Sequence, residues 1–286
     1  MTSITSNLSC LNAVKRHATT SNRPPVPSMA IVSASFDRSG SIASMGDAPK
    51  NALCSFVTDR KADATNNNSK INVTITTFDD RVERIFDNVS IENIHMTEQE
   101  ARNFVRPRGT TRLIATAIEE VARLRKAFAK LKADNLDTTV TALYMLFTDG
   151  FDNESRPLTA RDLNDAIRAA QGEGITCIFA GADQDAITNG AQYGFTPDTC
   201  LTMSSAPQTA AIGLRSCSQA ISRAVSGAPV GFTQLERSSS QNVDNLTPPT
   251  LPALQQRFQT MPTISSTTED DNMNFIMTPP PRITRS

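Results

Sequence analysis

The sequence of 286 residues has no tryptophan, only two histidines and only five cysteines. The histidines, His17 and His95, are far apart, and the cysteines are odd in number and form no C-x-x-C pair. Neither a zinc site nor a disulfide framework is therefore expected. Cys54 and Cys177 lie in apolar stretches, where free cysteine behaves as a small buried hydrophobic residue. A reducing compartment is the simplest fit to this cysteine usage.

A net charge of one sign and long apolar runs are also missing. The formal net charge is −1, which argues against a nucleic-acid or membrane-surface partner. No stretch is long and apolar enough to span a bilayer, and residues 1–17 lack the apolar core of a signal peptide. We therefore expect a cytoplasmic protein. Five basic residues at helical spacing beside apolar ones predict a solvated helix face: Arg123, Arg125, Lys126, Lys130 and Lys132.

Composition divides the chain into three parts. Residues 1–28 are rich in Ser, Thr and Asn and end in a proline-rich stretch, which predicts a flexible arm. Residues 227–286 are polar and proline-rich without a sustained period, which predicts a disordered tail. Between them, residues 29–226 are long enough to bury a core and are predicted to form one domain.

Within residues 29–226, apolar runs typical of strands alternate with segments of helical periodicity. Strands are predicted at 29–36, 70–78, 82–86, 139–148, 175–180 and 199–203, and helices at 44–61, 111–132, 159–171, 184–193 and 207–226. The run at 139–148, TVTALYMLFT, is apolar almost throughout, as a strand buried on both faces would be. Strands separated by such helices predict an α/β fold: a doubly wound, mostly parallel sheet with helices on both faces.

Polar clusters stand at three loops of this predicted sheet. Asp37, Ser39 and Ser41 follow the first strand, Thr111 opens the long helix, and Asp149 follows the most apolar strand. In open α/β sheets, ligands bind beyond the carboxyl ends of the strands, where the winding direction reverses. The two aspartates are therefore expected to reach one crevice.

The oxygen ligands at these loops suit a hard cation, Mg²⁺ or alternatively Mn²⁺ or Ca²⁺. No thiolate or imidazole in the loops would select a softer metal. Two carboxylates neutralise a divalent ion only formally. If one of them acts through water, the direct shell is electron-poor and keeps affinity and an open position for an incoming carboxylate. The alternative is that Asp37 and Asp149 only cap helices, since Asp after a strand is a common N-cap.

At these residues the sequence resembles von Willebrand factor A domains. Their metal-ion-dependent adhesion site consists of D-x-S-x-S, a distant Thr in a G-x-T loop, and an Asp in a (T/S)-D-G turn. Asp37, Ser39 and Ser41 match the first element, Thr111 the second and Asp149 the third. The resemblance covers about residues 29–226. D-x-S-x-S alone is a weak signal, but the full set in order is specific.

The resemblance implies a six-stranded, Rossmann-like sheet in the order 3-2-1-4-5-6 with one antiparallel edge strand. It also implies that the two serines coordinate the ion directly, and that an acidic residue of a partner protein often completes the shell. Some members change affinity by shifting the last helix, here 207–226. One departure is Arg38, a bulky cation between two ligands, which we expect to weaken metal affinity.

The predicted function is therefore divalent-cation-dependent protein–protein interaction, without enzymatic activity. A metal-dependent hydrolase acting on phosphoesters is one alternative, but it needs a base or nucleophile at the ion, and no histidine lies in the three loops. A dinucleotide-binding enzyme is disfavoured because no G-x-G-x-x-G follows the first strand. A structural scaffold with a vestigial metal site is a further alternative. The sequence leaves the partner and the oligomeric state open.

Overall fold

The computed structural model describes residues 28–242. The strands are β1 (Ser28–Asp37), β2 (Ser69–Phe78), β3 (Val82–Ser90), β4 (Thr139–Thr148), β5 (Thr176–Ala182) and β6 (Cys200–Met203). The α-helices are α1 (Ala48–Asn66), α2 (Glu98–Phe104), α3 (Leu113–Asp134), α4 (Ala160–Gly172), α5 (Ala186–Gln192), α6 (Pro207–Val225) and α7 (Gln234–Ser239). Short 3₁₀ helices cover Gly40–Met45, Ile91–Asn93 and Pro197–Thr199. The arm predicted over residues 1–28 lies outside the described residues except for Ser28.

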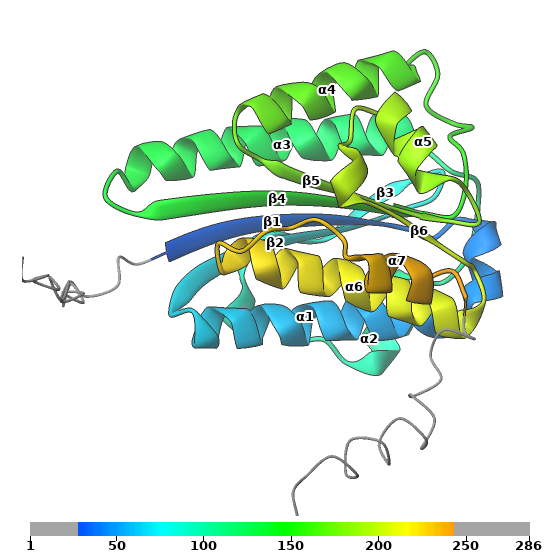
Figure 1. The fold of residues 1–286 in the computed structure, drawn as a ribbon, viewed down its shortest axis with the longest axis horizontal. Helices are drawn as coiled ribbons and strands as arrows, with labels where there is room; N and C mark the ends of the chain where they lie inside the picture. The colour runs from blue at the N-terminus through cyan, green and yellow to red at the C-terminus, as the bar shows by residue number, and fades with distance from the viewer. Residues whose placement is uncertain (1–27, 243–286) are drawn as a thin grey trace, which may run out of the picture. The chain divides into compact units, whose positions relative to one another are not determined.

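The six strands form one sheet in the order β3-β2-β1-β4-β5-β6, which confirms the doubly wound fold (Figure 1). All neighbouring strands are parallel except β3, which pairs antiparallel with β2 at the sheet edge. Strand β1 is bonded along its length to β2 on one side and β4 on the other. Because the chain winds in opposite directions from β1 and β4, the switch point lies between these two strands.

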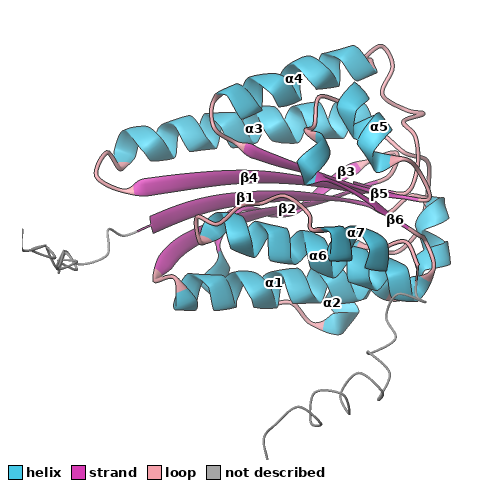
Figure 2. Cartoon of the chain, in the orientation of Figure 1, coloured by secondary structure: helices cyan, strands magenta, loops and turns pink. Residues whose placement is uncertain are grey.

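Helices cover both faces of the sheet, so the central strands are buried on both sides (Figure 2). Alternate residues of β4 face opposite layers, as a period of two requires: Leu143, Met145 and Phe147 pack toward α1 and α6, and Ala142, Tyr144 and Leu146 pack toward α3 and α4. This explains why the sequence of β4 is apolar almost throughout. The arrangement holds the ends of β1 and β4 rigidly, because their backbones are bonded on both sides.

Helix boundaries differ from the predictions where local chemistry outweighs hydrophobic periodicity. The helix predicted at 44–61 is a 3₁₀ turn followed by α1, which begins at Ala48 with Pro49 in its first turn, a position that suits proline. The short helix α2 was not predicted, although Thr97 and Glu100 form a capping box at its start. Its seven residues include a single fully buried apolar side chain, Ala101, so it has almost no apolar periodicity to detect.

The predicted start of the tail at residue 227 is wrong for its first part. Residues 227–242 are ordered against the domain and include α7, whose N-cap Thr233 forms a capping box with Glu236. Phe232 is buried, and Arg223 of α6 forms an ion pair with Glu236 at 2.9 Å. A polar, proline-containing segment can therefore be held by hydrogen bonds and one aromatic anchor. Residues 243–286 of the predicted tail lie outside the described residues.

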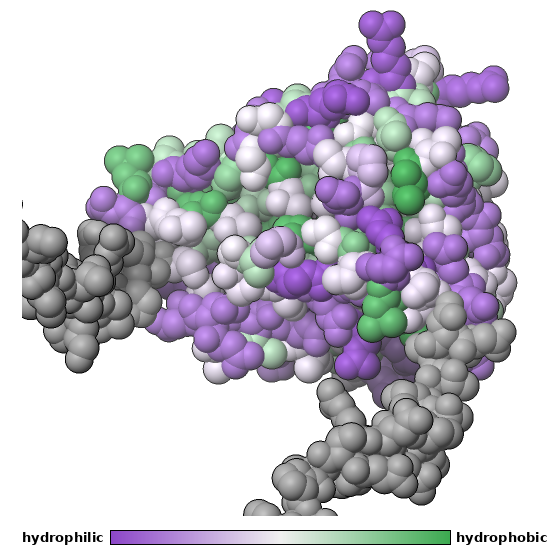
Figure 3. Space-filling view, viewed as in Figure 1, coloured by the Kyte–Doolittle hydropathy of each residue, from purple (hydrophilic) through white to green (hydrophobic). Residues whose placement is uncertain are grey.

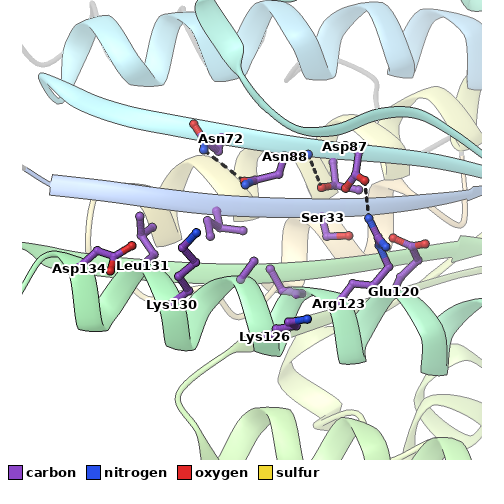
Figure 4. A pocket seen from close by; sticks show the side chains of 14 residues that line it. Ser33, Asn72, Asp87, Asn88, Glu120, Arg123, Lys126, Lys130, Leu131 and Asp134 are labelled. Atoms are coloured by element: carbon purple, nitrogen blue, oxygen red, sulfur yellow. Dashed lines mark hydrogen bonds and ion pairs between the residues drawn. The ribbon is translucent and has the colours of Figure 1, made fainter.

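The basic run on α3 faces outward, as predicted. Lys126, Lys130 and Lys132 are exposed, and Arg123 and Arg125 form ion pairs with Asp87 and Glu173. Several of these side chains border a groove of about 520 Å³ between α3 and strands β1 to β3 (Figure 4). The groove has a polar floor, in which Asn72 donates a hydrogen bond to Asn88 at 3.2 Å.

The surface and the cysteines have the features that the composition predicts. On the face drawn in Figure 3, hydrophobic residues form separate small patches among hydrophilic ones. Among residues 28–242, no helix combines the length and apolar character needed to cross a bilayer.

The four cysteines in this range are free thiols, and Cys177, Cys200 and Cys217 are buried. Burial raises the pKa of each of these three thiols to about 12, so they stay protonated.

Candidate functional site

The structure brings the three predicted loops together at one end of the sheet. Asp37 is the last residue of β1, and Asp149 directly follows β4, the neighbouring strand. Pairing in register aligns Phe36 with Phe147. The two aspartates therefore leave the sheet side by side because their strands are adjacent and parallel.

Hydroxyl groups of the first loop meet the carboxylate of the third. Ser41 Oγ donates to Asp149 Oδ1 at 2.7 Å, and Ser39 Oγ lies 3.5 Å from the same oxygen. The two serine oxygens are 3.1 Å apart. Alternate positions of the D-x-S-x-S segment thus converge on Asp149, while Gly40 between them is exposed.

Asp37 is fully buried beneath this cluster. Its Oδ1 accepts the backbone N–H of Ser39 at 2.7 Å, and its Oδ2 accepts the hydroxyl of Thr148 at 2.6 Å. Burial raises the pKa of Asp37 to about 6, against the hydrogen bonds from Thr148 and Ser39, and Asp149 adds to the rise. The protein therefore holds a carboxylate here at an electrostatic cost when it is ionised. The role of Thr148 in orienting Asp37 was not predicted, although it precedes Asp149 in the same turn.

Asp149 is partly exposed, as a group that meets a ligand must be. Burial raises the pKa of Asp149 above its ordinary value, against hydrogen bonds from Ser41 and Ser39, and the nearby Asp183 adds to the rise. Neither Asp37 nor Asp149 forms an ion pair with any basic side chain among residues 28–242.

Thr111 is buried against the same turn. A Cβ placed on Gly150 would lie 3.6 Å from the Thr111 hydroxyl oxygen, so the threonine side chain packs on the backbone beside Asp149. The Thr111 backbone is fixed in both directions by Asn153: its N–H donates to Asn153 Oδ1 at 2.8 Å, and its carbonyl accepts the Asn153 N–H at 3.0 Å. All five predicted site residues therefore gather at one place.

Helix α3 has no capping side chain of its own, since Arg112 before it makes no such hydrogen bond. The loop after β4 supplies the caps instead. Asp152 Oδ1 accepts the N–H of Ile114 at 3.0 Å, and Ser155 Oγ accepts that of Ala115 at 2.9 Å. These bonds satisfy donors that a helix start leaves free. Asp152 is therefore a capping residue, but the helix that it caps begins about forty residues earlier in the chain. Asn153 and Ser155 were missed, since nothing in the local sequence links them to that helix.

The side chain of Arg38 does not pair with Asp37 or Asp149, so the charge that was expected to oppose the ion is neutralised by other carboxylates. It is 2% exposed, and its Nε donates to Asp79 Oδ2 at 2.9 Å. Its Nη1 donates to Glu83 Oε2 at 2.8 Å. The reason is the alternation of an extended backbone: a residue between Asp37 and Ser39 projects to the other side. Asp79, in the turn between β2 and β3, is fully buried in this ion cluster.

The donor set fits a hard cation and little else. Among residues 28–242 no group of three His, Cys, Asp or Glu side chains is placed to hold a metal ion. The site offers two carboxylates and three hydroxyls instead. Hard divalent cations accept such oxygen ligands and retain exchangeable waters, so the residues present fit such an ion.

Solved structures similar in fold include three of adhesive or matrix proteins. Proximal thread matrix protein 1 from the mussel byssus is 13% identical, with a TM-score of 0.48 and 70% of this chain and 47% of that chain covered. A form of the same protein with zinc in its MIDAS motif is 20% identical, with a TM-score of 0.46 and 66% and 47% covered. The pilus adhesin SpaC from Lactobacillus rhamnosus GG is 15% identical, with a TM-score of 0.48 and 70% and 31% covered.

The chain spans less than half the length of each of these three chains. A search of curated protein sequences finds no match. The family model of the von Willebrand factor type A domain matches residues 35–212, which contain all five site residues and five of the six strands in full. This match extends over more than half of the chain, and the observed strand order is the one that the family implies. The chain belongs to the von Willebrand factor type A domain family.

Proposed function

We propose that the chain binds one divalent cation, Mg²⁺ or alternatively Mn²⁺ or Ca²⁺, and uses it to bind an acidic side chain of a partner protein. Asp37, Ser39, Ser41, Thr111 and Asp149 hold the ion, directly or through water. Ser41 and Asp149 face the surface, so the position left for the partner opens outward.

The observation that carries this proposal is the pair of carboxylates without a counter-charge. Asp37 and Asp149 have raised pKa values and no basic partner among the described residues. Buried charges in proteins are paired or coordinate metals. Two carboxylates without a basic partner, beside the hydroxyls of Ser39 and Ser41 that converge on Asp149, are best explained by a cation that both carboxylates bind.

Recognition suits this arrangement better than catalysis. Catalysis by a metal-bound water needs a base or an electron-rich shell that places the water on a substrate. Here Ser39, Ser41 and Thr148 supply hydroxyls around the two carboxylates, and no histidine lies in the three loops. A partly neutralised cation with exchangeable waters attracts a carboxylate, and the exposed Phe151 beside Asp149 offers apolar contact area next to it.

Metal binding tests the site itself. Calorimetric titration with Mn²⁺ or Mg²⁺ is expected to show one site in the wild type and loss of at least about tenfold in affinity for Asp149→Ala, since even residues behind a ligand cost about 10–100-fold. Asp87→Ala removes an exposed carboxylate from β3, away from the three loops, and is expected to bind as the wild type does. If Asp149→Ala and the wild type bind the metal equally well, the proposed metal site is wrong.

Partner capture tests the use of the ion. A protein captured from host lysate in the presence of Mg²⁺ is expected to be lost with EDTA, and with Ser39→Ala, Thr111→Ala or Asp149→Ala, while circular dichroism of the variants is unchanged. Asp87→Ala again serves as the control. Capture that ignores EDTA and all three substitutions contradicts metal-dependent recognition. Metal-dependent turnover of a phosphoester, abolished by Asp37→Ala, would favour a hydrolase instead.

A further inference from the structure

We propose that Arg38 is a positioning residue for the metal site: through Asp79, Glu83 and Arg108 it fixes the loop of Thr111 against the loop of Ser39. This inference rests on the proposed function. It reverses the role that the sequence suggested for Arg38, from a charge that opposes the ion to a clamp that assembles the ligands.

The side chains of Arg38, Asp79, Glu83 and Arg108 form one ion cluster, which does not include the proposed metal ligands Asp37 and Asp149. Asp79 Oδ2 accepts Arg38 Nε at 2.9 Å and Arg108 Nε at 2.5 Å. Glu83 bonds both arginines as well, Arg38 at 2.8 Å and Arg108 at 2.6 Å. Each carboxylate thus bridges the two guanidinium groups, and Arg38 also donates to the carbonyl of Phe104 at the end of α2.

The backbone of the same residues ties the two ligand loops together. The N–H of Arg108 donates to the carbonyl of Arg38 at 2.9 Å, and the N–H of Arg112 donates to the carbonyl of Asp79 at 2.9 Å. These two bonds stand on either side of Thr111. The N–H of Gly40 also donates to the carbonyl of Gly109 at 3.3 Å. The loop that carries Thr111 is therefore held at both ends by residues that contact Arg38 or belong to its loop.

Close packing at Gly109 leaves this loop little freedom. Its φ is +66°, and a Cβ there would clash with Asp80 Oδ1 and come within 3.3 Å of the Asp79 Cβ. Only glycine allows the loop to lie against the turn that carries Asp79. The ion cluster and the contact at Gly109 both hold the loop of Thr111 against the turn that carries Asp79. The cluster does so by electrostatic attraction, and the glycine by leaving room for close packing.

The cluster itself adds no net charge beside the metal site. Two arginines and two carboxylates balance, and the carboxylates stay ionised at neutral pH: the hydrogen bond from Arg38 lowers the pKa of Glu83 to about 2. Removing Arg38 would leave the fully buried Asp79 with only the half-exposed Arg108. Loss of one partner from a buried ion pair is destabilising, and here the effect falls on the turn that holds the loop of Thr111.

Mn²⁺ affinity measured by calorimetry on the full chain tests the inference. Arg38→Ala is expected to bind about tenfold or more weakly, the range found for residues that orient metal ligands. Arg38→Lys keeps the charge but only part of the hydrogen bonding, and is expected to recover part of the affinity. Arg108→Ala removes the half-exposed arginine of the cluster and is expected to weaken binding more than twofold, but less than Arg38→Ala does.

Arg60→Ala is the matched control. Arg60 is as buried as Arg38 and also bonds a carboxylate, Asp63, at 2.8 Å, but it joins α1 to α6 through Ser218 and Ser222. It is expected to lower stability without changing Mn²⁺ affinity. Amide hydrogen exchange of residues 108–112 is expected to rise in Arg38→Ala and to stay unchanged in Arg60→Ala.

A double-mutant cycle shows whether Arg38 acts through Thr111. In a Thr111→Ala background, Arg38→Lys is expected to have less than twofold effect, because the ligand that it positions is gone. If the wild type binds no Mn²⁺, the proposed function fails. If the wild type binds Mn²⁺ and the folded variants Arg38→Lys and Arg108→Ala bind within twofold of it, the proposed function stands and the positioning role of Arg38 is wrong.

Discussion

Replacing Asp37 with asparagine is expected to raise the melting temperature of the metal-free protein at pH 7 and to abolish its stabilisation by Mg²⁺. The pKa of the buried Asp37 carboxyl is about 6 instead of 3.8, and a difference of this size corresponds to about 3 kcal/mol of lost stability when the group is ionised. For a domain of this size that is roughly 6–12 °C in Tm. Asp37→Asn would thus stabilise the metal-free fold while removing a carboxylate that the metal needs.

Asparagine can occupy the site with its hydrogen bonds intact. The amide oxygen takes the place of Asp37 Oδ1 and accepts the N–H of Ser39. The amide NH₂ donates to Thr148 Oγ1, whose own hydrogen turns to the carbonyl of Gly150, 3.1 Å away. The substitution therefore keeps the hydrogen bonds to Ser39 and Thr148, with one of the two amide N–H groups paired, and removes the charge.

The pH dependence of the wild type follows from the same carboxyl. Its pKa is raised in the folded state, so its proton stabilises the fold fully below about pH 3.8, and this contribution is lost as the pH rises through about 6. The advantage of Asp37→Asn in metal-free buffer should therefore shrink as the pH falls from 7 to 4. Thermal melts at pH 5, 6 and 7, with EDTA and with Mg²⁺, measure this difference.

Asp87→Asn is the control, because exposed ion pairs such as that of Asp87 with Arg123 change stability by at most about 1 kcal/mol. A fall in Tm for Asp37→Asn in EDTA would mean that the ionised carboxylate stabilises the fold without a metal. The case for a cation as its partner would then be lost. The same conclusion would follow if Mg²⁺ raised the Tm of the wild type and of Asp37→Asn equally.

The candidate site could be predicted because each part of it is short in sequence and follows a recognisable strand. Asp37, Ser39 and Ser41 are neighbours, and Asp149 ends the most apolar segment of the chain. Parallel strands present their carboxyl ends at one edge, so placing the strands also placed these residues. The order of the strands came from the resemblance, and the structure confirms it.

Features that depend on distant partners were not predictable in the same way. The direction of Arg38 is set by Asp79 and Glu83, more than forty residues later in the chain. The caps of α3 come from Asp152 and Ser155 in a different loop. In both cases the sequence shows a charged or polar residue of ordinary type, and only the packed fold says which group it meets.

The ordered segment after α6 is the clearest such case, and ending the chain at residue 226 is expected to destabilise the domain strongly relative to a chain ending at residue 242. Arg237 of α7 donates to the carbonyls of Cys200 at 2.8 Å and Pro197 at 3.0 Å. Ser240 accepts the N–H of Ser204 through its carbonyl and donates its hydroxyl to Thr202 at 2.8 Å. These bonds cover β6, whose outer edge would otherwise be open.

The expected loss is on the order of 4 kcal/mol, or about 10 °C in Tm. Burial of Phe232 is worth about 2 kcal/mol, and hydrogen bonds to charged groups contribute about 1.5–3 kcal/mol each before ordering entropy is subtracted. The point variant Arg237→Ala, in the chain ending at residue 242, is expected to lose about half of this. Urea denaturation of the three proteins measures the differences.

An unpaired edge strand also changes how the shorter chain behaves in solution. Exposed strand edges pair with other chains, so the chain ending at residue 226 is expected to associate as its concentration rises, which light scattering detects. Arg237→Ala keeps the segment and should remain monodisperse relative to its parent. If the chain ending at residue 226 melts at the same temperature as the longer one and does not associate, α7 contributes nothing to the fold. The domain would then end with α6, as the composition of the sequence suggested.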